Sequence, residues 1–403
     1  MEDETTVYEE LGVPRVVNAA GTKTRIGGSL IRPEAVEAMS RAAEAFARLS
    51  DLQVRAGELI SEVTGAEAGY VGSGAAACMT LAAAAAIAGD DLGTMARLPD
   101  TDGVPNEIVM PRTHRNGYDH AFRAAGAEIV DVGNNDNYLG TGSNSTEPWE
   151  LADAITDDTV AVGYMQKVFS TPPLEDVVDV AHEHDVPVIV DAAAEVPPRE
   201  NLSAFVEAGA DMVVFSGGKA IRGPQTTGIL AGKREYVRSA ALQHLDMHVA
   251  ESVWEPPTEL FDKDALDGVP RQGIGRPLKV GKEELVGLIA ALEAFLEEDQ
   301  TELDAEWEAR LAIVEEGLAD IPGVTTRREP GGKLMVAPET YVDVDPEAAA
   351  VDAVELVGSL RTETPRIFVG SDDLSDGGFT VNPMCLTDDE AAYVAERIRE
   401  ATT

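Results

Sequence analysis

An aspartate and a lysine each follow an apolar run in the middle of the 403-residue chain. Val188-Ile189-Val190 leads to Asp191, and Met212-Val213-Val214-Phe215 leads through Ser216-Gly217-Gly218 to Lys219. A lysine amine can hold an aldehyde cofactor as a Schiff base, and a buried carboxylate can keep the nitrogen of a pyridine ring protonated. The combination therefore predicts a pyridoxal 5'-phosphate site in which Lys219 and Asp191 are catalytic and also bind the cofactor.

Small residues around the lysine agree with a bulky ligand there. Gly217 and Gly218 let the backbone turn tightly beside it, and Ser216 can reach a cofactor phosphate. An aspartate at the end of a strand and an exposed lysine are both common, so either residue alone predicts little. The prediction depends on finding them together, with the glycines and with Gly223-Pro224-Gln225.

A second glycine-containing segment, Gly72-Ser73-Gly74-Ala75, is the candidate phosphate site. It lies between a short run, Gly69–Val71, and an alanine-rich stretch typical of a helix. The first turn of a helix presents free backbone N–H groups and a favourable dipole to an anion, and Ser73 adds a hydroxyl. We therefore expect Gly72, Ser73, Gly74 and Ala75 to bind the cofactor, with an ordinary tight turn as the alternative.

The histidines divide into one candidate for the site and several with simpler explanations. His114 follows a predicted strand, so it can stack on the pyridine ring or move a proton as a catalytic residue, with an ordinary loop histidine as the alternative. His182 and His184 lie on an acidic helix and are expected at the surface. His244 and His248 are four residues apart, but no third ligand is apparent, so no metal site is expected.

These residues need a sheet whose strand ends meet. Short apolar runs alternate with helical stretches, which predicts an α/β fold with crossover connections and a mainly parallel, buried sheet. Ligands of such sheets lie outside the carboxyl ends of the strands, so Asp191 and Lys219 are expected at the same edge. The predicted strands are 69–71, 108–110, 128–132, 160–164, 186–190 and 212–215, and the predicted helices are 75–87, 117–125, 174–184 and 202–208.

The pattern changes after Gly232. Residues 252–281 are rich in proline, glycine and charge and are typical of a connecting region. A long helical stretch, 282–318, is followed by short strands at 341–344, 366–369 and 379–381 and by two further helices. We predict an N-terminal arm and large cofactor-binding domain over 1–265, a connecting segment over 266–281, and a small C-terminal α+β domain over 282–403.

The charge of the chain is extreme, with 31 basic and 73 acidic residues and a formal net charge of −42. The acidic residues are spread over the whole length, and such self-repulsion is tolerable where salt screens it. We therefore expect a halophilic protein from a high-salt cytoplasm. A nucleic acid partner is disfavoured, because its backbone binds clustered lysines and arginines.

Other features agree with a cytoplasmic enzyme. Cys78 and Cys385 are the only cysteines, which argues against a disulfide framework. No stretch approaches 18 uninterrupted apolar residues, so no membrane interaction is expected. The acidic start of the chain, residues 1–4, differs from a signal peptide.

Several segments together resemble the selenocysteine-synthase-related group of fold-type-I pyridoxal-phosphate enzymes. The resemblance runs from about residue 8 to residue 400. The segments that carry it are Asn18-Ala19-Ala20-Gly21-Thr22, Gly72-Ser73-Gly74-Ala75-Ala76-Ala77, Asp191-Ala192-Ala193, Ser216-Gly217-Gly218-Lys219-Ala220-Ile221-Arg222-Gly223-Pro224-Gln225 and Gly275-Arg276-Pro277-Leu278-Lys279-Val280-Gly281-Lys282-Glu283-Glu284. It implies an aminotransferase-like fold with a mainly parallel seven-stranded sheet.

The group includes L-seryl-tRNA selenium transferases and D-glucosaminate-type ammonia-lyases, and the chain looks more similar to the second. Selenium transferases carry an additional N-terminal tRNA-binding domain, whereas Asn18 comes almost at once here. The resemblance thus implies an α,β-eliminating lyase acting on a hydroxylated amino acid or amino sugar acid, with Lys219 removing the α-proton. A selenium or sulfur transferase, a racemase or aldolase, and a non-catalytic cofactor-binding scaffold remain alternatives.

The resemblance also implies residues that bind the substrate and a homodimer or higher homo-oligomer. Arg366, at the start of a predicted strand, corresponds in position to the arginine that binds the substrate carboxylate, with a surface arginine as the alternative. The active site of this fold lies at a dimer interface. Gly275, Arg276 and Lys279 can therefore reach the cofactor phosphate, or a substrate phosphate, of a neighbouring subunit.

Overall fold

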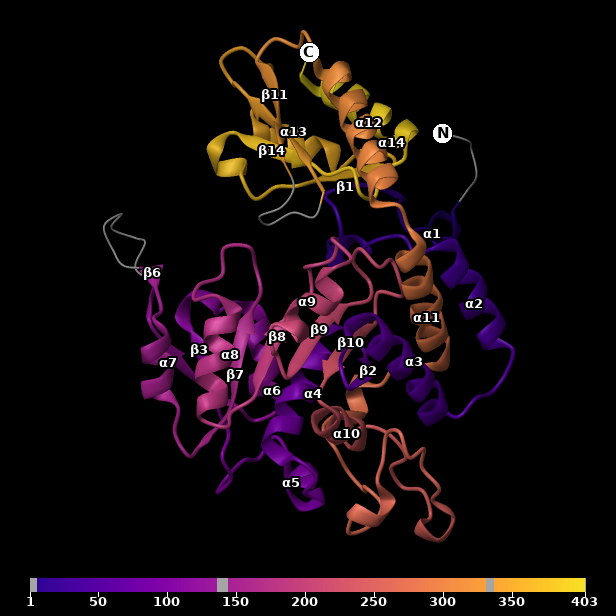
Figure 1. The fold of residues 1–403 in the computed structure, drawn as a ribbon. Coiled ribbons are helices and arrows are strands. Elements are labelled where there is room, and N and C mark those ends of the chain that lie inside the picture. The colour runs from indigo at the N-terminus through magenta and orange to yellow at the C-terminus, as the bar shows by residue number, and fades with distance from the viewer. Residues whose placement is uncertain (1–5, 136–143, 331–336, 403) are drawn as a thin grey trace. The chain divides into compact units, whose positions relative to one another are not determined.

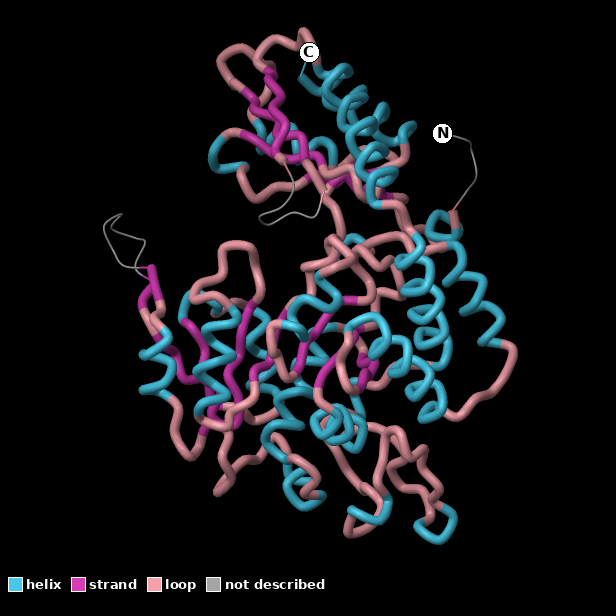
Figure 2. The backbone as a smooth tube through the Cα atoms, in the orientation of Figure 1, coloured by secondary structure: helices cyan, strands magenta, loops and turns pink. Residues whose placement is uncertain are grey.

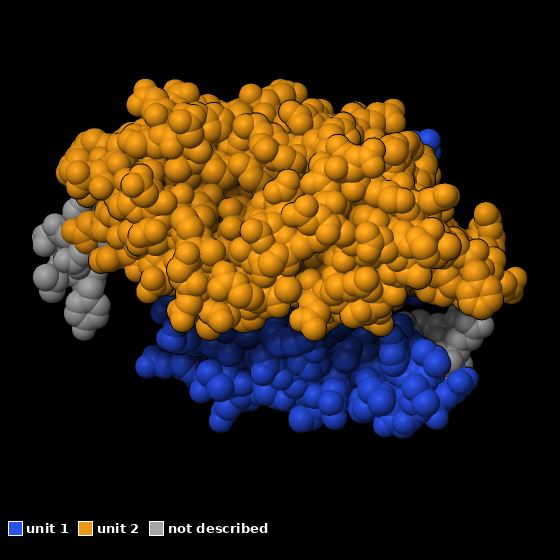
Figure 3. Space-filling view, turned by 90° about the horizontal axis from the view of Figure 1, so that it is seen from below, with its two compact units in different colours: residues 1–30, 297–403 blue, residues 31–296 orange. Residues whose placement is uncertain are grey.

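The computed structural model describes residues 6–135, 144–330 and 337–402. The chain forms two compact units, and each is described by itself. The larger comprises Ile31–Leu296, and the smaller comprises Met1–Leu30 together with Glu297–Thr403 (Figure 3). The acidic start of the chain, residues 1–4, lies outside the described residues.

A seven-stranded sheet forms the centre of the larger unit (Figure 1). The five strands from β9 to β4 pair in parallel, and β10 runs antiparallel to both of its neighbours, β9 and the edge strand β2. This confirms the predicted α/β fold with its mainly parallel sheet. The strand order is β2 (Ala68–Gly72), β10 (Gly228–Gly232), β9 (Met212–Ser216), β8 (Val188–Asp191), β7 (Thr159–Met165), β3 (Glu107–Pro111) and β4 (Glu128–Val132).

Helices cover both faces of this sheet, so successive residues of each central strand enter two different cores (Figure 2). In β8, for example, Val188 and Val190 face one core and Ile189 faces the other. One face packs against α2 (Pro33–Ala43), α3 (Leu49–Thr64), α7 (Pro148–Ala154), α8 (Leu174–Glu183), α9 (Asn201–Glu207) and α11 (Lys282–Glu297). The other packs against α4 (Ala75–Ala88), α5 (Leu92–Arg97), α6 (His120–Ala124) and α10 (Arg234–Leu242).

The alanine-rich helix α4 is buried along most of its length. Its small side chains allow it to lie close to the sheet, and it contacts β7, β8, β9 and β10. A helix that crosses so many strands holds its first turn in a defined position at the sheet edge, where the phosphate site is predicted.

The described residues of the smaller unit form two sheets and three helices of eight residues or more. Strand β1 (Val16–Ala19) pairs in parallel with β13 (Arg366–Val369), while β11 (Val324–Glu329), β12 (Glu339–Val344) and β14 (Gly378–Val381) form an antiparallel sheet. The helices are α12 (Gln300–Leu318), α13 (Ala353–Leu360) and α14 (Asp388–Thr402). A short helix, α1 (Val7–Glu10), precedes β1 in this unit. The larger unit also contains two strands of two residues each, β5 (Asn134–Asn135) and β6 (Asn144–Ser145), which pair with each other.

The units divide the chain differently from the predicted domains. The helical stretch 282–318 is two helices, and α11 belongs to the larger unit because Leu285, Leu292 and Phe295 pack in the core of its sheet. The first thirty residues belong to the smaller unit, because β1 pairs with β13. The boundaries therefore fall at residues 30 and 296 rather than 265 and 281.

Several elements had no counterpart in the predicted set, among them β1, α2, α3, α5, α7, β10, α10 and β11. In the connecting region 252–281, only short 3₁₀ turns occur, including Lys263–Ala265 and Arg276–Leu278. Across the described part of the chain, no helix combines the length and the apolar character that crossing a membrane requires.

Candidate active site

The register of the sheet brings the predicted residues to one edge. Asp191 pairs with Met165 of β7 and with Val214 of β9, and both of these strands run parallel to β8. On the other side of β9, Gly228 of β10 pairs with both Ser216 and Gly72. The carboxyl ends of β7, β8, β9 and β2 therefore meet, at the edge where Asp191 and Lys219 are predicted to lie.

Asp191 is a carboxylate held back from water at the end of β8. Burial raises the pKa of its carboxyl above the usual value, although a hydrogen bond and two ammonium groups act against this. The hydrogen bond comes from the Ala193 N–H to Oδ1, at 3.1 Å, and the ammonium groups are those of Lys219 and Lys167. Asp191 and Lys219 are thus electrostatic partners, and a further positive charge beside this carboxylate would be stabilised.

Lys219 lies in a tight turn that follows β9. The Gly223 N–H donates to the Gly217 carbonyl at 2.8 Å, and the Arg222 N–H donates to the Lys219 carbonyl at 3.0 Å. Neither glycine before the lysine can carry a side chain without movement. A Cβ on Gly218 would lie 2.7 Å from Gln225 Cα, and a Cβ on Gly217 would lie 2.7 Å from Leu288 Cδ1.

Arg32 holds this turn from a distant part of the chain. It is only 6% exposed, its Nε donates to the Ile221 carbonyl at 2.8 Å, and its own N–H donates to the Arg222 carbonyl at 2.9 Å. Sequence reasoning missed Arg32, because 189 positions separate it from Ile221 and no local motif marks it. It positions the lysine turn through the backbone.

His114 lies next to Met165, the residue of β7 that pairs with Asp191 of β8. The Met165 N–H donates to its Nδ1 at 3.3 Å, and its ring meets the ring of Tyr164 edge-on at 4.5 Å between centroids. Burial lowers the pKa of His114 to about 4, so the ring is neutral near pH 7. With Nδ1 as an acceptor, the proton is assigned to the buried Nε2, and a hydrogen bond with the backbone of Thr171 acts against the effect of burial on the pKa of this ring.

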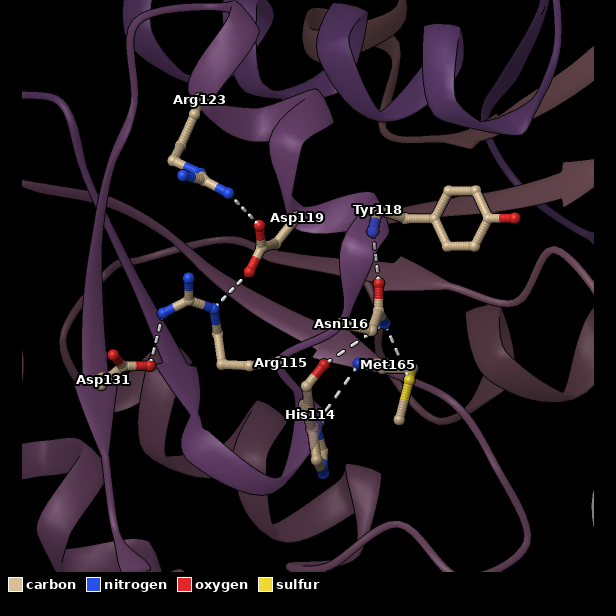
Figure 4. A network of polar contacts seen from close by, with 8 residues as sticks. All are labelled: His114, Arg115, Asn116, Tyr118, Asp119, Arg123, Asp131 and Met165. Atoms are coloured by element: carbon tan, nitrogen blue, oxygen red, sulfur yellow. Dashed lines mark hydrogen bonds and ion pairs between the residues drawn. The ribbon is translucent and has the colours of Figure 1, made fainter. Parts of the chain in front are cut away.

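A network of charged residues fixes the loop that carries His114 (Figure 4). The carboxylate of Asp119, 4% exposed, bonds to Arg115 and to Arg123, and Arg115 also bonds to Asp131 at 2.6 Å. Asn116 accepts the Tyr118 N–H at 2.7 Å, which caps the turn that follows. Several charges anchored on one buried carboxylate give this loop a defined conformation.

The segment 72–75 joins the end of β2 to the first turn of α4. Gly74 has φ +121°, and no side chain caps the helix, so the first N–H groups of α4 have no intrahelical acceptor. A Cβ added at Gly74 would meet open space, whereas one added at Gly228 would lie 2.5 Å from Ala75 N. Gly228 thus allows β10 to approach the backbone of this turn, the candidate phosphate site.

The predicted residues of the connecting region lie beside this turn within the same chain. The Ser73 N–H donates to the Leu278 carbonyl at 3.1 Å, and Gly275 is packed so closely that a Cβ would lie 2.8 Å from Leu81 Cδ2. Arg276 and Lys279 are exposed. Together with burial, they lower the pKa of His244 to about 4, which places both cations near the carboxyl end of α10.

Arg366 belongs to the smaller unit and is exposed there, at the start of β13. In the same unit, Asn18 organises a turn through Nδ2, which donates to the Gly21 carbonyl at 2.9 Å and to the Gly28 carbonyl at 3.2 Å. Asn382, which is buried, lies against Gly21 and donates to Glu339 at 2.7 Å. The Asn18–Thr22 segment therefore has a structural role within that unit.

His182 and His184 are both exposed, as expected, and His182 also bonds to Asp211 at 2.9 Å. Asp211 is 1% exposed and also pairs with Lys233 at 2.6 Å, so this cluster stabilises the sheet edge opposite the candidate site.

The residues at the carboxyl edge fit pyridoxal phosphate. A buried carboxylate of raised pKa suits a pyridinium nitrogen, and an uncapped helix start suits a phosphate. Lys167 was missed by sequence reasoning, yet it contributes to the field at Asp191 and forms an ion pair with Glu195.

Comparison with known proteins agrees with this arrangement. The model of the aminotransferase class-V family matches residues 120–255. D-glucosaminate-6-phosphate ammonia lyase of Salmonella typhimurium is 33% identical, over 98% of this chain and 97% of that protein. A solved structure of D-glucosaminate-6-phosphate ammonia-lyase matches with a TM-score of 0.81 and 32% identity, over 99% of this chain and 98% of the other.

Two further relatives share the fold group but carry other names. The 5'-C-glycyluridine monooxygenase-decarboxylase of a Streptomyces species is 31% identical, over 98% of this chain and 92% of that protein. L-seryl-tRNA(Sec) selenium transferase of Nitratidesulfovibrio vulgaris is 26% identical, over 96% of this chain and 81% of that protein. This chain is thus an enzyme whose cofactor is pyridoxal phosphate, and it belongs to the fold-type-I family that contains D-glucosaminate-6-phosphate ammonia lyase.

Proposed function

We propose that this enzyme is an ammonia-lyase that eliminates the β-hydroxyl of a hydroxylated amino acid or amino sugar acid, such as D-glucosaminate or its 6-phosphate, and releases its nitrogen as ammonia. The observation that carries the proposal is the electrostatic pair of Asp191 and Lys219 at the carboxyl edge of the sheet. The similarity to the ammonia lyase over nearly the whole chain supports the reaction class.

Pyridoxal phosphate, when bound, supplies an aldehyde for the substrate amine and an electron-accepting ring. Asp191 holds a proton at the ring nitrogen, and the Lys219 amine takes the proton from the substrate α-carbon. The Lys219 ammonium formed in this way returns its proton to the β-hydroxyl as that group leaves, and we assign the neutral ring of His114 to a hydrogen bond that orients the hydroxyl. One water leaves with the hydroxyl and one enters on hydrolysis, so the products are ammonia and a 2-oxo-3-deoxy acid.

Anion binding is shared among the remaining candidates. We assign Gly72, Ser73, Gly74, Ala75, Ser216 and Gly275 to the cofactor, with the first turn of α4 receiving its phosphate. Arg276 and Lys279 are assigned to a substrate anion. We also assign Arg366 to the substrate carboxylate.

A selenium transferase is the second candidate, because the selenium transferases are also relatives. Its substrate would be a tRNA, which must approach a protein of formal net charge −42. For this reason, we rank it below the lyase and propose that no nucleic acid binds. We further propose a halophilic, cytoplasmic protein that forms a homodimer or a larger homo-oligomer.

The test is product formation by the purified protein in molar potassium chloride. Incubation with D-glucosaminate and with D-glucosaminate 6-phosphate should release ammonia and a 2-oxo acid in equal amounts, with no requirement for oxygen. Release from only one of the two acids would identify whether the substrate is phosphorylated. Absence of both products from either acid, with cofactor bound, would contradict the proposed reaction.

A further inference from the structure

A pocket of about 250 Å³ lies in the larger unit between α10, the end of α4 and the segment that follows α10. Its apolar wall includes Leu242, Leu260 and Phe261, each less than 5% exposed. Gly89 and Asp90, at the end of α4, also line it. Because α4 has 14 residues, this end lies about 21 Å from the first turn at the candidate active site.

Two polar groups of the pocket have no partner within the described chain. The hydroxyl of Ser239, a residue only 2% exposed, makes no hydrogen bond, and neither does the buried Nε of Arg238. Buried polar groups are nearly always satisfied, by protein, by water or by a ligand. Adjacent residues of one helix therefore present a guanidinium and a hydroxyl to the same cavity, which is the chemistry that binds a carboxylate.

Arg238 lines the pocket with its Nε buried and unbonded, and no ion pair joins it to a carboxylate among the described residues. Its only charged neighbours in the pocket lining are Asp90, Glu235 and Asp262, which are exposed. The pocket thus combines one inner cation, three rim carboxylates and an apolar wall.

The wall is held in place by the segment around it. Trp254 packs on Phe261 with 6.2 Å between ring centroids, and Lys263 Nζ donates to the Trp254 carbonyl at 2.8 Å. The Phe261 N–H donates to the Pro257 carbonyl at 2.9 Å. These contacts give the cavity a defined shape in which a small ligand can be recognised.

We propose that this pocket binds a free α-amino acid with an apolar side chain. The carboxylate would bond to Arg238 and Ser239, the ammonium would face the rim carboxylates, and the side chain would lie on Leu260 and Phe261. A simple carboxylate would meet repulsion from the rim, and a simple amine would leave Arg238 unpaired. The zwitterion satisfies both ends.

L-leucine is the probe, titrated calorimetrically into the full-length, cofactor-loaded protein in molar potassium chloride. We expect saturable binding, and we expect 4-methylpentanoate and isopentylamine, which each lack one charge, to bind at least tenfold more weakly. Arg238→Met should weaken leucine binding by tenfold or more. Ala265→Phe, at an exposed position of the pocket, should block it without disturbing the core.

Arg41→Met is the matched control, because Arg41 is exposed on α2 and does not line the pocket. It should bind leucine as the wild type does. The cofactor absorbance should be unchanged by leucine in every variant, because the cofactor lies at the other end of α4. Two results would overturn the proposal: no saturable leucine binding, or binding that both Arg238→Met and Ala265→Phe leave intact.

Discussion

Replacing Gly228 with alanine tests the assignment of the phosphate site. The added Cβ would lie 2.5 Å from the nitrogen of Ala75, the first residue of α4, and close to the Gly74 carbonyl. Unstrained carbon contacts begin at about 3.5 Å, so the two backbones must separate by roughly 1 Å. A hydrogen bond of about 2.9 Å that lengthens by this amount is lost.

The expected cost follows from that displacement. A hydrogen bond to a charged group contributes about 1.5–3 kcal/mol, so losing one between α4 and the phosphate should weaken cofactor binding by roughly 10- to 100-fold. The close contact itself should lower the free energy of unfolding by about 1–3 kcal/mol. Fluorescence titration of the cofactor-free protein with pyridoxal phosphate measures the first quantity, and thermal unfolding measures the second.

Gly358→Ala is the control for this substitution. Gly358 lies within α13 in the smaller unit, and a Cβ there would meet open space. Alanine should raise helix stability by up to about 1 kcal/mol and leave cofactor affinity unchanged. If Gly228→Ala lost stability but bound pyridoxal phosphate with wild-type affinity, the first turn of α4 would not be the phosphate site.

Three further predictions concern the lysine turn, the buried histidines and the surface charge. Arg32→Lys keeps the positive charge but loses the hydrogen bond from Nε to the Ile221 carbonyl, so we expect weaker cofactor binding and a shifted absorbance spectrum of the bound cofactor. An unchanged spectrum would exclude a positioning role for Arg32. His114 and His244 have a pKa of about 4 against an ordinary 6.5, so the unfolded chain takes up their protons first as the pH falls. The free energy of unfolding of the cofactor-free protein should therefore be level above pH 6.5 and fall between pH 6.5 and about 4, by roughly 3 kcal/mol per histidine. Denaturant titrations at several pH values measure this fall, and it should be smaller in the His244→Gln variant. The melting temperature should drop on transfer from molar to millimolar potassium chloride, and a constant value would contradict halophilic adaptation.

Residues of the site that end strands were predictable from sequence. Asp191 and Ser216 are the last residues of β8 and β9, and the apolar runs before them mark those strands clearly. The turn before α4 was predictable for the same reason, because an alanine-rich stretch follows it. In each case, local sequence determines both the element and the place where it ends.

Residues that act through distant contacts were not predictable. Arg32 reaches the lysine turn across 189 positions, and His244 meets the Tyr70 hydroxyl across 174. Strand β10 was missed because Gly228-Ile229-Leu230-Ala231-Gly232 is short and begins and ends with glycine, and only its pairing with β2 and β9 defines it.

The break between α11 and α12, near the boundary of the two units, is marked by a helix cap that the apolar periodicity of the sequence hides. Helices α11 and α12 each bury apolar residues at helical spacing, so the stretch 282–318 resembles one helix. Asp299 marks the break, because its side chain accepts the Thr301 N–H at 2.8 Å as an N-cap. An N-cap residue such as Asp299 therefore indicates the start of a new helix even where the apolar periodicity continues.

The central claim is that Lys219 carries the cofactor. The measurement is the absorbance spectrum of the protein purified in high salt, before and after borohydride, followed by peptide mapping by mass spectrometry. We predict an absorbance band near the visible edge that reduction removes, together with a pyridoxyl label on Lys219 and on no other lysine. The absence of a band after addition of pyridoxal phosphate, or a label on a different lysine such as Lys167, would contradict the account.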